Sequence, residues 1–64
     1  MSVRITLRDK EFTIRPGMTV RDALKQVGIQ PESVIPTRDG EAITDDEILR
    51  DGEHIRLIAV ISGG

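Results

Sequence analysis

The sequence has no cysteine, no tryptophan and no tyrosine, and Phe12 is its one aromatic residue. Without cysteine the chain forms no disulfide, no thiolate zinc site and no cysteine nucleophile, which fits the reducing cytoplasm where we expect the protein. No apolar stretch reaches the roughly 20 residues that a membrane-spanning helix needs. Met1–Arg4 leads directly into an alternating pattern, so we expect no secretory signal. A chain of 64 residues makes one domain with a thin core and no large substrate cavity.

The formal net charge is −2, but the two halves of the chain differ in sign. Residues 1–30 carry six Lys and Arg against three Asp and Glu, a net of +3, and residues 31–64 carry three against eight, a net of −5. An acidic C-terminal half would attract a basic partner surface, although a solvated surface is the simpler interpretation. Lys and Arg do not cluster with aromatic residues, so we expect no direct binding of nucleic acid.

The first half predicts two strands and a helix. Apolar and polar residues alternate over residues 3–8 and again over residues 11–15, the period of half-buried strands joined in a hairpin. Thr19 is a suitable N-cap for the helix that follows, and Gly28 fits the left-handed position that ends it. The apolar face of this helix repeats at i, i+3, i+4 and i+7. It consists of Val20, Ala23, Leu24 and Val27.

The second half is less regular. Residues 34–38 predict a short strand, but Pro36 cannot donate to a ladder, which indicates an edge position or a break. Asp39-Gly40 is a strong signal for a tight turn, and residues 42–43 predict a stub of the returning strand. Thr44 and Glu47 resemble a capping box and predict one helical turn over residues 45–49. We expect Ile48 and Leu49 of this turn to fill the core.

After a turn at Asp51-Gly52, residues 53–61 form the last and longest predicted strand. The order of these elements is that of the ubiquitin-like β-grasp, an α+β fold. One helix then packs across one face of a mixed four- to five-stranded sheet, and the first and last strands pair in parallel at its centre. We expect residues 1–61 to form this domain and residues 62–64 to form a flexible tail.

The last strand carries an apolar excess on the face turned away from the helix. If Ile55, Leu57 and Ala59 face the helix, Ile58 and Val60 face solvent together with His54 and Arg56. A plain alternative is that β-branched residues are simply favoured in strands. Our interpretation is a docking patch for a partner, which is formed by Ile58, Val60 and Ile61.

Ser62-Gly63-Gly64 follows this strand directly. Glycine has no Cβ, so such an arm can enter a channel too narrow for other residues. We therefore expect Ser62 and Gly63 to thread a partner's active site and the Gly64 carboxylate to be the reacting group. The alternative is a frayed terminus without function.

The rest of the sequence offers no other reactive site. His54 is the only histidine and is expected to be an exposed strand residue. Asp45, Asp46 and Glu47 could bind a cation, but carboxylates at a helix start are explained by the helix dipole. The glycines outside the tail occur singly in turns and form no phosphate-binding loop. We assign no catalytic residue and no metal ligand, and we expect the protein not to be an enzyme.

The end of the chain is similar to the ends of the small sulfur-carrier proteins. The resemblance lies in Asp51-Gly52-Glu53, in residues 55–58 and in Ile61-Ser62-Gly63-Gly64. The chain resembles the ThiS/MoaD group of thiamin and molybdopterin synthesis and the TtuB-like carriers of tRNA thiolation. It is most similar to the TtuB-like and ThiS-like branch, which favours tRNA 2-thiolation or thiamin synthesis.

This resemblance implies a carrier whose end is activated by another protein. An E1-like adenylyltransferase would use ATP and magnesium to convert the Gly64 carboxylate to an acyl-adenylate. A sulfurtransferase would then supply sulfur, which leaves a thiocarboxylate at Gly64 for a downstream enzyme. The carrier itself would bind no cofactor and no membrane, and we expect a monomer.

Two other functions remain open. The protein could be a ubiquitin-like modifier joined through Gly64 to lysines of target proteins. It could also be a β-grasp interaction module whose end undergoes no chemistry.

Overall fold

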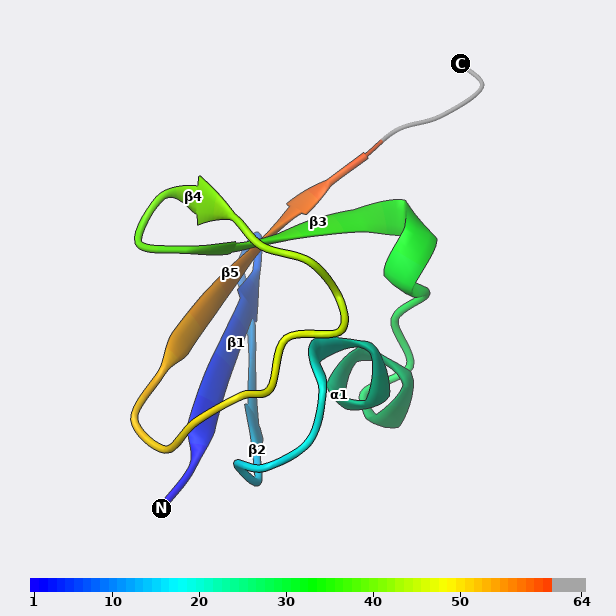
Figure 1. Cartoon of the computed structure of the whole chain (residues 1–64). Coiled ribbons are helices and arrows are strands. Elements are labelled where there is room, and N and C mark those ends of the chain that lie inside the picture. Colours follow the sequence, from blue (N-terminus) through cyan, green and yellow to red (C-terminus); the bar gives the residue numbers. More distant parts are fainter. Residues whose placement is uncertain (61–64) are drawn as a thin grey trace.

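The alternating and helical patterns of the sequence form five strands and one helix in the computed structural model, which describes residues 1–60 (Figure 1). The elements are the strands β1 (Val3–Leu7) and β2 (Lys10–Ile14), the helix α1 (Val20–Gln26), the 3-10 helix η1 (Pro31–Ser33), and the strands β3 (Val34–Arg38), β4 (Glu41–Ala42) and β5 (His54–Ala59). The end of the last predicted strand at Ile61 and the tail, residues 62–64, lie outside the described residues.

The five strands form one mixed sheet in the order β2-β1-β5-β3-β4. β5 is the middle strand and runs parallel to β1, with Ile5 opposite Ile55 and Leu7 opposite Leu57. The other three pairings are antiparallel. A central parallel pair built from the first and last strands confirms the topology that the sequence predicts, and its apolar content suits a buried position.

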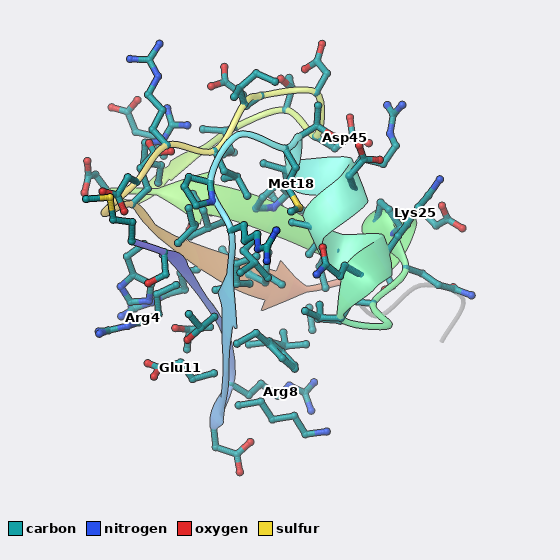
Figure 2. The ribbon with its side chains drawn as sticks, turned by 90° about the horizontal axis from the view of Figure 1, so that it is seen from below. Arg4, Arg8, Glu11, Met18, Lys25 and Asp45 are labelled. Atoms are coloured by element: carbon teal, nitrogen blue, oxygen red, sulfur yellow. The ribbon has the colours of Figure 1, made fainter. Side chains whose placement is uncertain are left out.

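The helix α1 packs across one face of the sheet and closes the core. Val20, Ala23 and Leu24 on the helix are fully buried, as are Ile5 and Ile55 on the central strands. We call the opposite side of the sheet, away from α1, the open face. Figure 2 shows Arg4 and Glu11 on β1 and β2 and Lys25 on the helix. None of the helices in residues 1–60 is long and apolar enough to cross a membrane.

Local signals set both ends of α1 as predicted. The Thr19 side chain caps the first turn, since its Oγ1 accepts a hydrogen bond of 3.1 Å from the Asp22 N–H. Gly28 follows the helix with a φ of +83°, the left-handed conformation that glycine adopts at low cost. The two ends therefore follow from residues that adjoin the helix in sequence.

The predicted helical turn over residues 45–49 is wrong. These residues form a turn followed by an extended segment, in which Ile48 makes an isolated bridge to Thr19. The carbonyls of Asp45 and Glu47 accept hydrogen bonds from the Arg21 and Val20 N–H groups, at 2.8 and 3.0 Å. These N–H groups at the start of α1 have no partner within the helix, so the segment provides a cap from outside. That use of its carbonyls requires an extended backbone.

The same segment places only one of its two apolar side chains in the core. Leu49 is fully buried, and its backbone exchanges hydrogen bonds with Met18 and Gly17. Ile48 is 50% exposed, so the prediction that both residues fill the core is correct for Leu49 and wrong for Ile48. Neighbouring residues of an extended chain point to opposite sides, whereas a helical turn would have turned both inward.

The strand β3 is neither at the edge of the sheet nor broken, contrary to the expectation from Pro36. It lies between β5 and β4 and is continuous over five residues. The Pro36 carbonyl accepts a hydrogen bond of 2.9 Å from the Ile43 N–H on the β4 side. In an extended strand the nitrogen and the carbonyl of one residue face the same side. The Pro36 nitrogen therefore faces away from β5, and its missing N–H removes no hydrogen bond between β3 and β5. The strand β4 has already ended there, since it covers only Glu41–Ala42.

An exposed ion pair links α1 to the extended segment at residues 45–49. The Arg21 Nε and Nη2 atoms donate to the two Asp45 carboxylate oxygens at 3.0 and 3.1 Å. The hydrogen bond from Arg21, together with its charge, holds the pKa of Asp45 below its ordinary value. A lowered carboxylate pKa stabilises the fold above the pKa of the unfolded chain, and this contribution is lost as the pH falls through the lower folded value.

We therefore expect Asp45→Asn to lower the thermal midpoint at neutral pH and to lose this effect in acid. The difference in midpoint between wild type and variant should shrink from about pH 5 to about pH 2, because protonation removes the same charge from the wild type. Circular dichroism melts across this range measure the difference. Asp51→Asn is the control, since Asp51 forms no ion pair among residues 1–60. A difference that stays constant with pH would contradict the assignment.

Candidate docking face beside the C-terminal arm

The strand β5 leads toward the C-terminal arm and is paired with a strand on each side. It pairs with β1 in parallel register over residues 54–57 and with β3 in antiparallel register over residues 55–59. The last described residue is also held, since the Val60 N–H donates a hydrogen bond of 2.9 Å to the Ser33 carbonyl. Ser62, Gly63 and Gly64 thus follow a rigid strand at the centre of the sheet, although their own positions lie outside the described residues, as does that of Ile61.

The alternation predicted for β5 is confirmed. Ile55 and Leu57 point into the core and are 0% and 4% exposed, while Ile58 and Val60 are 52% and 40% exposed. Ala59 is partly buried. An apolar pair on the open face is therefore a property of the folded chain.

A third apolar side chain joins this pair from β3. Ile35 is 41% exposed and lies directly opposite Ile58 in the β3–β5 register. Side chains opposite one another in an antiparallel pair lie within contact range on the same face. We call Ile35, Ile58 and Val60 the apolar patch. The sequence analysis missed Ile35, although its place next to a buried Pro36 in an alternating strand was a usable signal.

Toward the start of β5, the open face carries polar side chains instead of apolar ones. His54 Nε2 lies 2.6 Å from the Thr6 Oγ1 on β1, a hydrogen bond that fixes the imidazole. The Thr37 hydroxyl donates a hydrogen bond of 2.7 Å to the Arg56 carbonyl and ties β3 to β5. Beside these residues is a hollow of about 300 Å³. It is lined by Thr37, Asp39, Gly40, His54 and Arg56.

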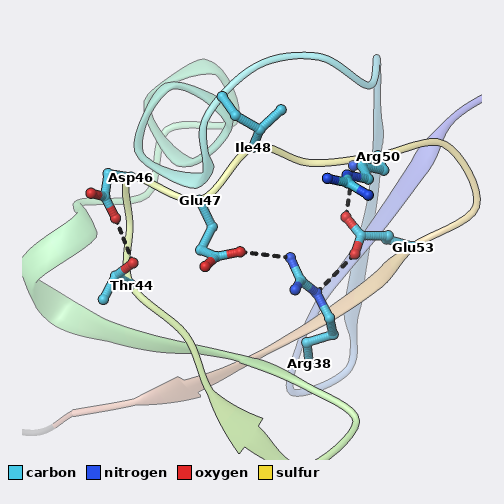
Figure 3. A pocket seen from close by; sticks show the side chains of 7 residues that line it. All are labelled: Arg38, Thr44, Asp46, Glu47, Ile48, Arg50 and Glu53. Carbon is cyan, nitrogen blue, oxygen red and sulfur yellow. Dashed lines mark hydrogen bonds and ion pairs between the residues drawn. The ribbon is translucent and has the colours of Figure 1, made fainter.

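A larger hollow of about 590 Å³ lies on the other side of the molecule, along the 44–53 segment (Figure 3). Arg38 forms ion pairs with two of the carboxylates that line it. Arg38 Nη2 lies 3.2 Å from Glu47 Oε1, and its Nε lies 2.8 Å from Glu53 Oε2. Glu53 also accepts a hydrogen bond of 2.6 Å from the Arg50 backbone N–H. These contacts hold the 44–53 segment against β3.

The three adjacent carboxylates considered as a cation site point to three different partners. Asp45 pairs with Arg21, Asp46 accepts a hydrogen bond from the Thr44 hydroxyl, and Glu47 pairs with Arg38. No group of three or more histidine and acidic side chains placed to hold a metal occurs in residues 1–60. The explanation by a helix dipole was wrong, because no helix begins at this segment.

Known proteins match this chain over its whole length. The model of the ThiS family matches residues 2–64. The sulfur carrier protein TtuB of Thermus thermophilus is 29% identical, in an alignment covering 97% of this chain and 100% of the relative.

Solved structures agree on the fold. A ubiquitin of Caldiarchaeum subterraneum has a TM-score of 0.64 at 23% identity, covering 100% of this chain and 98% of that one. SAMP1 from Haloferax volcanii has a TM-score of 0.65 at 24% identity and full coverage of both chains. At these identities the two structures establish the ubiquitin-like β-grasp and nothing about chemistry. The family match goes further, and the chain therefore belongs to the ThiS family, the ubiquitin-like sulfur-carrier group that its sequence resembles.

Proposed function

We propose that this protein is a sulfur carrier whose Gly64 carboxylate is adenylated by an E1-like enzyme and then converted to a thiocarboxylate. The observation that carries the proposal is the ThiS family match, which extends through the Gly-Gly end of the chain. The resemblance to the carrier TtuB supports it. By the same similarities, tRNA 2-thiolation or thiamin synthesis is the proposed destination of the sulfur.

The proposed chemistry needs no catalytic group from the carrier. A carboxylate is a poor acyl donor, and attack of its oxygen on the α-phosphorus of ATP releases pyrophosphate and forms an acyl-adenylate. A sulfur nucleophile can then add to the carbonyl carbon, and AMP departs as the leaving group. Splitting one difficult substitution into two easier steps is the usual benefit of a covalent intermediate. ATP and magnesium belong to the activating enzyme.

The contribution of this chain is to hold and present its end. Val60 is fixed to Ser33, and residues 61–64 can reach at most about 14 Å beyond it when fully extended. A partner that docks on Ile58, Val60 and Ile61 therefore keeps its active site within reach of Gly64. Ser62 and Gly63 would occupy the narrow approach to that site, where glycine's missing side chain is an advantage.

The test is adenylation of the purified full chain by its adenylyltransferase with ATP and magnesium. We expect the enzyme to exchange pyrophosphate into ATP when the carrier is present, and we expect a carrier with a C-terminal amide to give no exchange. Binding without exchange by the wild type would favour an interaction module. Exchange followed by adducts on target lysines would favour a protein modifier.

The docking role of the apolar patch gives a separate prediction. Ile58→Asp should raise the Kd for the adenylyltransferase about tenfold or more, because an unpaired carboxylate would be buried at the contact. Isothermal titration without ATP measures this affinity. Ile48→Asp is the matched control. Ile48 is similarly exposed, at 50%, but it lies in the 45–49 segment and not in the apolar patch. Equal affinities of the two variants, both with wild-type thermal midpoints, would reject the patch as the docking site.

A further inference from the structure

The apolar patch adjoins an exposed arginine on the same face of the sheet. Arg56 precedes Ile58 by two residues on β5, so both side chains point to the open face, and both are exposed. Across the strand pair, Thr37 lies opposite Arg56 just as Ile35 lies opposite Ile58. The hollow lined by Arg56 thus begins where the patch ends. A partner that covers the patch also covers this hollow.

The charge of Arg56 is not neutralised within residues 1–60. Four ion pairs occur there, and none includes Arg56. Arg4, the other arginine on the open face of the central strands, pairs with Glu11 at 3.6 Å. Asp39 is the one acidic residue that lines the hollow, and it forms no ion pair with Arg56. No carboxylate of residues 1–60 therefore forms an ion pair with the guanidinium.

Docking on the apolar patch would remove much of the water around this guanidinium. A desolvated arginine without a partner anion costs free energy, whereas a carboxylate meeting the guanidinium in bidentate geometry compensates that cost and adds specificity. The Thr37 hydroxyl is already bonded to the Arg56 carbonyl and the imidazole of His54 to Thr6. The guanidinium is thus the main donor that the hollow still offers to a ligand.

We propose that the adenylyltransferase inserts a carboxylate side chain into this hollow, against Arg56, while apolar side chains cover Ile35, Ile58 and Val60. The inference rests on the proposed function and names the chemistry of the partner surface. It reverses the sign expected from the sequence, since the acidic C-terminal half suggested a basic partner. The acidic residues of that half gather between Asp39 and Glu53, whereas β5 turns His54 and Arg56 to the open face.

The experiment is titration of the full-length chain and its variants into the purified adenylyltransferase. Arg56→Glu should raise the Kd about tenfold or more, because two carboxylates would then face each other, and Arg56→Gln should give a smaller loss. Lys25→Glu is the control, since it makes the same charge change on an exposed helical residue. Asp39→Asn should leave the affinity unchanged or increase it, because it removes a like charge from the hollow.

The outcomes separate this inference from the function on which it rests. Wild-type chain that is adenylated, with Arg56→Glu bound as tightly as Lys25→Glu, would overturn the carboxylate contact and leave the carrier function intact. Weaker binding of Asp39→Asn would also overturn it, because that result indicates a cationic partner group. Wild-type chain that is neither bound nor adenylated would overturn both. Thermal midpoints of all variants show whether each one is folded.

Discussion

One alanine added after Gly64 is expected to abolish adenylation by the E1-like enzyme. The addition moves the reacting carboxylate about 3.5 Å along the extended arm and places a Cβ beside it. Because a displacement of about 1 Å can cost a hundredfold in rate, we expect at least about a hundredfold loss of pyrophosphate exchange. Affinity for the enzyme should change little, since the docking patch is untouched.

Two further variants separate the effect of moving the carboxylate from the effect of adding a Cβ beside it. Gly64→Ala keeps the length of the chain and adds only the Cβ, so it measures the width of the channel by itself. Ser62→Ala keeps both length and carboxylate and should remain active. An elongated chain that is adenylated at the wild-type rate would contradict the role of Gly64 as the reacting residue.

The second large effect concerns stability. Leu49→Ala should lower the free energy of unfolding by about 2–5 kcal/mol, because it leaves a cavity among fully buried side chains. A domain of 64 residues has a total stability of only about 3–10 kcal/mol, so this loss is a large share of the total. Urea denaturation followed by circular dichroism gives the difference directly.

Ile48→Ala is the matched control for this experiment. Ile48 adjoins Leu49 in sequence but is 50% exposed, so its truncation should cost less than about 1 kcal/mol. The contrast tests the extended form of residues 45–49 against the helical turn that their sequence suggests. Equal losses from the two substitutions would favour the turn, in which both side chains would face the core.

The parts of the fold that the sequence predicts are those specified by neighbouring residues. The hairpin β1–β2, the cap at Thr19 and the glycine after α1 depend on short-range patterns, and the structure confirms them. The alternation along β5 also belongs to this class, and it correctly placed Ile58 and Val60 on the open face.

The errors arise where contacts between distant segments decide the conformation. Thr44 and Glu47 have the spacing of a capping box, yet the start of α1 needs the carbonyls of Asp45 and Glu47, and that requirement keeps the segment extended. The sequence of residues 44–49 alone does not show that α1 needs these carbonyls as hydrogen-bond acceptors. The position of Pro36 depends likewise on which side of β3 its nitrogen faces, which the pairing of the sheet determines.

In the candidate site, too, neighbouring residues predict some features and contacts between distant segments decide others. Individual residues of β5 could be assigned to a face from their alternation, but the joining of Ile35 to Ile58 depends on the β3–β5 register. The net charge of each half of the chain misled for a related reason. Of the seven acidic residues in 39–53, folding brings Asp39 alone to the hollow that Arg56 lines. Charge on a surface is a property of three-dimensional placement, and a sum over residues does not give it.

We propose the carboxylate of Gly64 as the reactive group of this protein. The most direct measurement is the intact mass of the full chain after incubation with its adenylyltransferase, ATP, magnesium and a sulfur donor. We expect a mass gain equal to the exchange of one oxygen for one sulfur, located at Gly64 by fragmentation and absent without ATP. An unchanged mass while the enzyme releases AMP, or adducts found only on lysines, would contradict it.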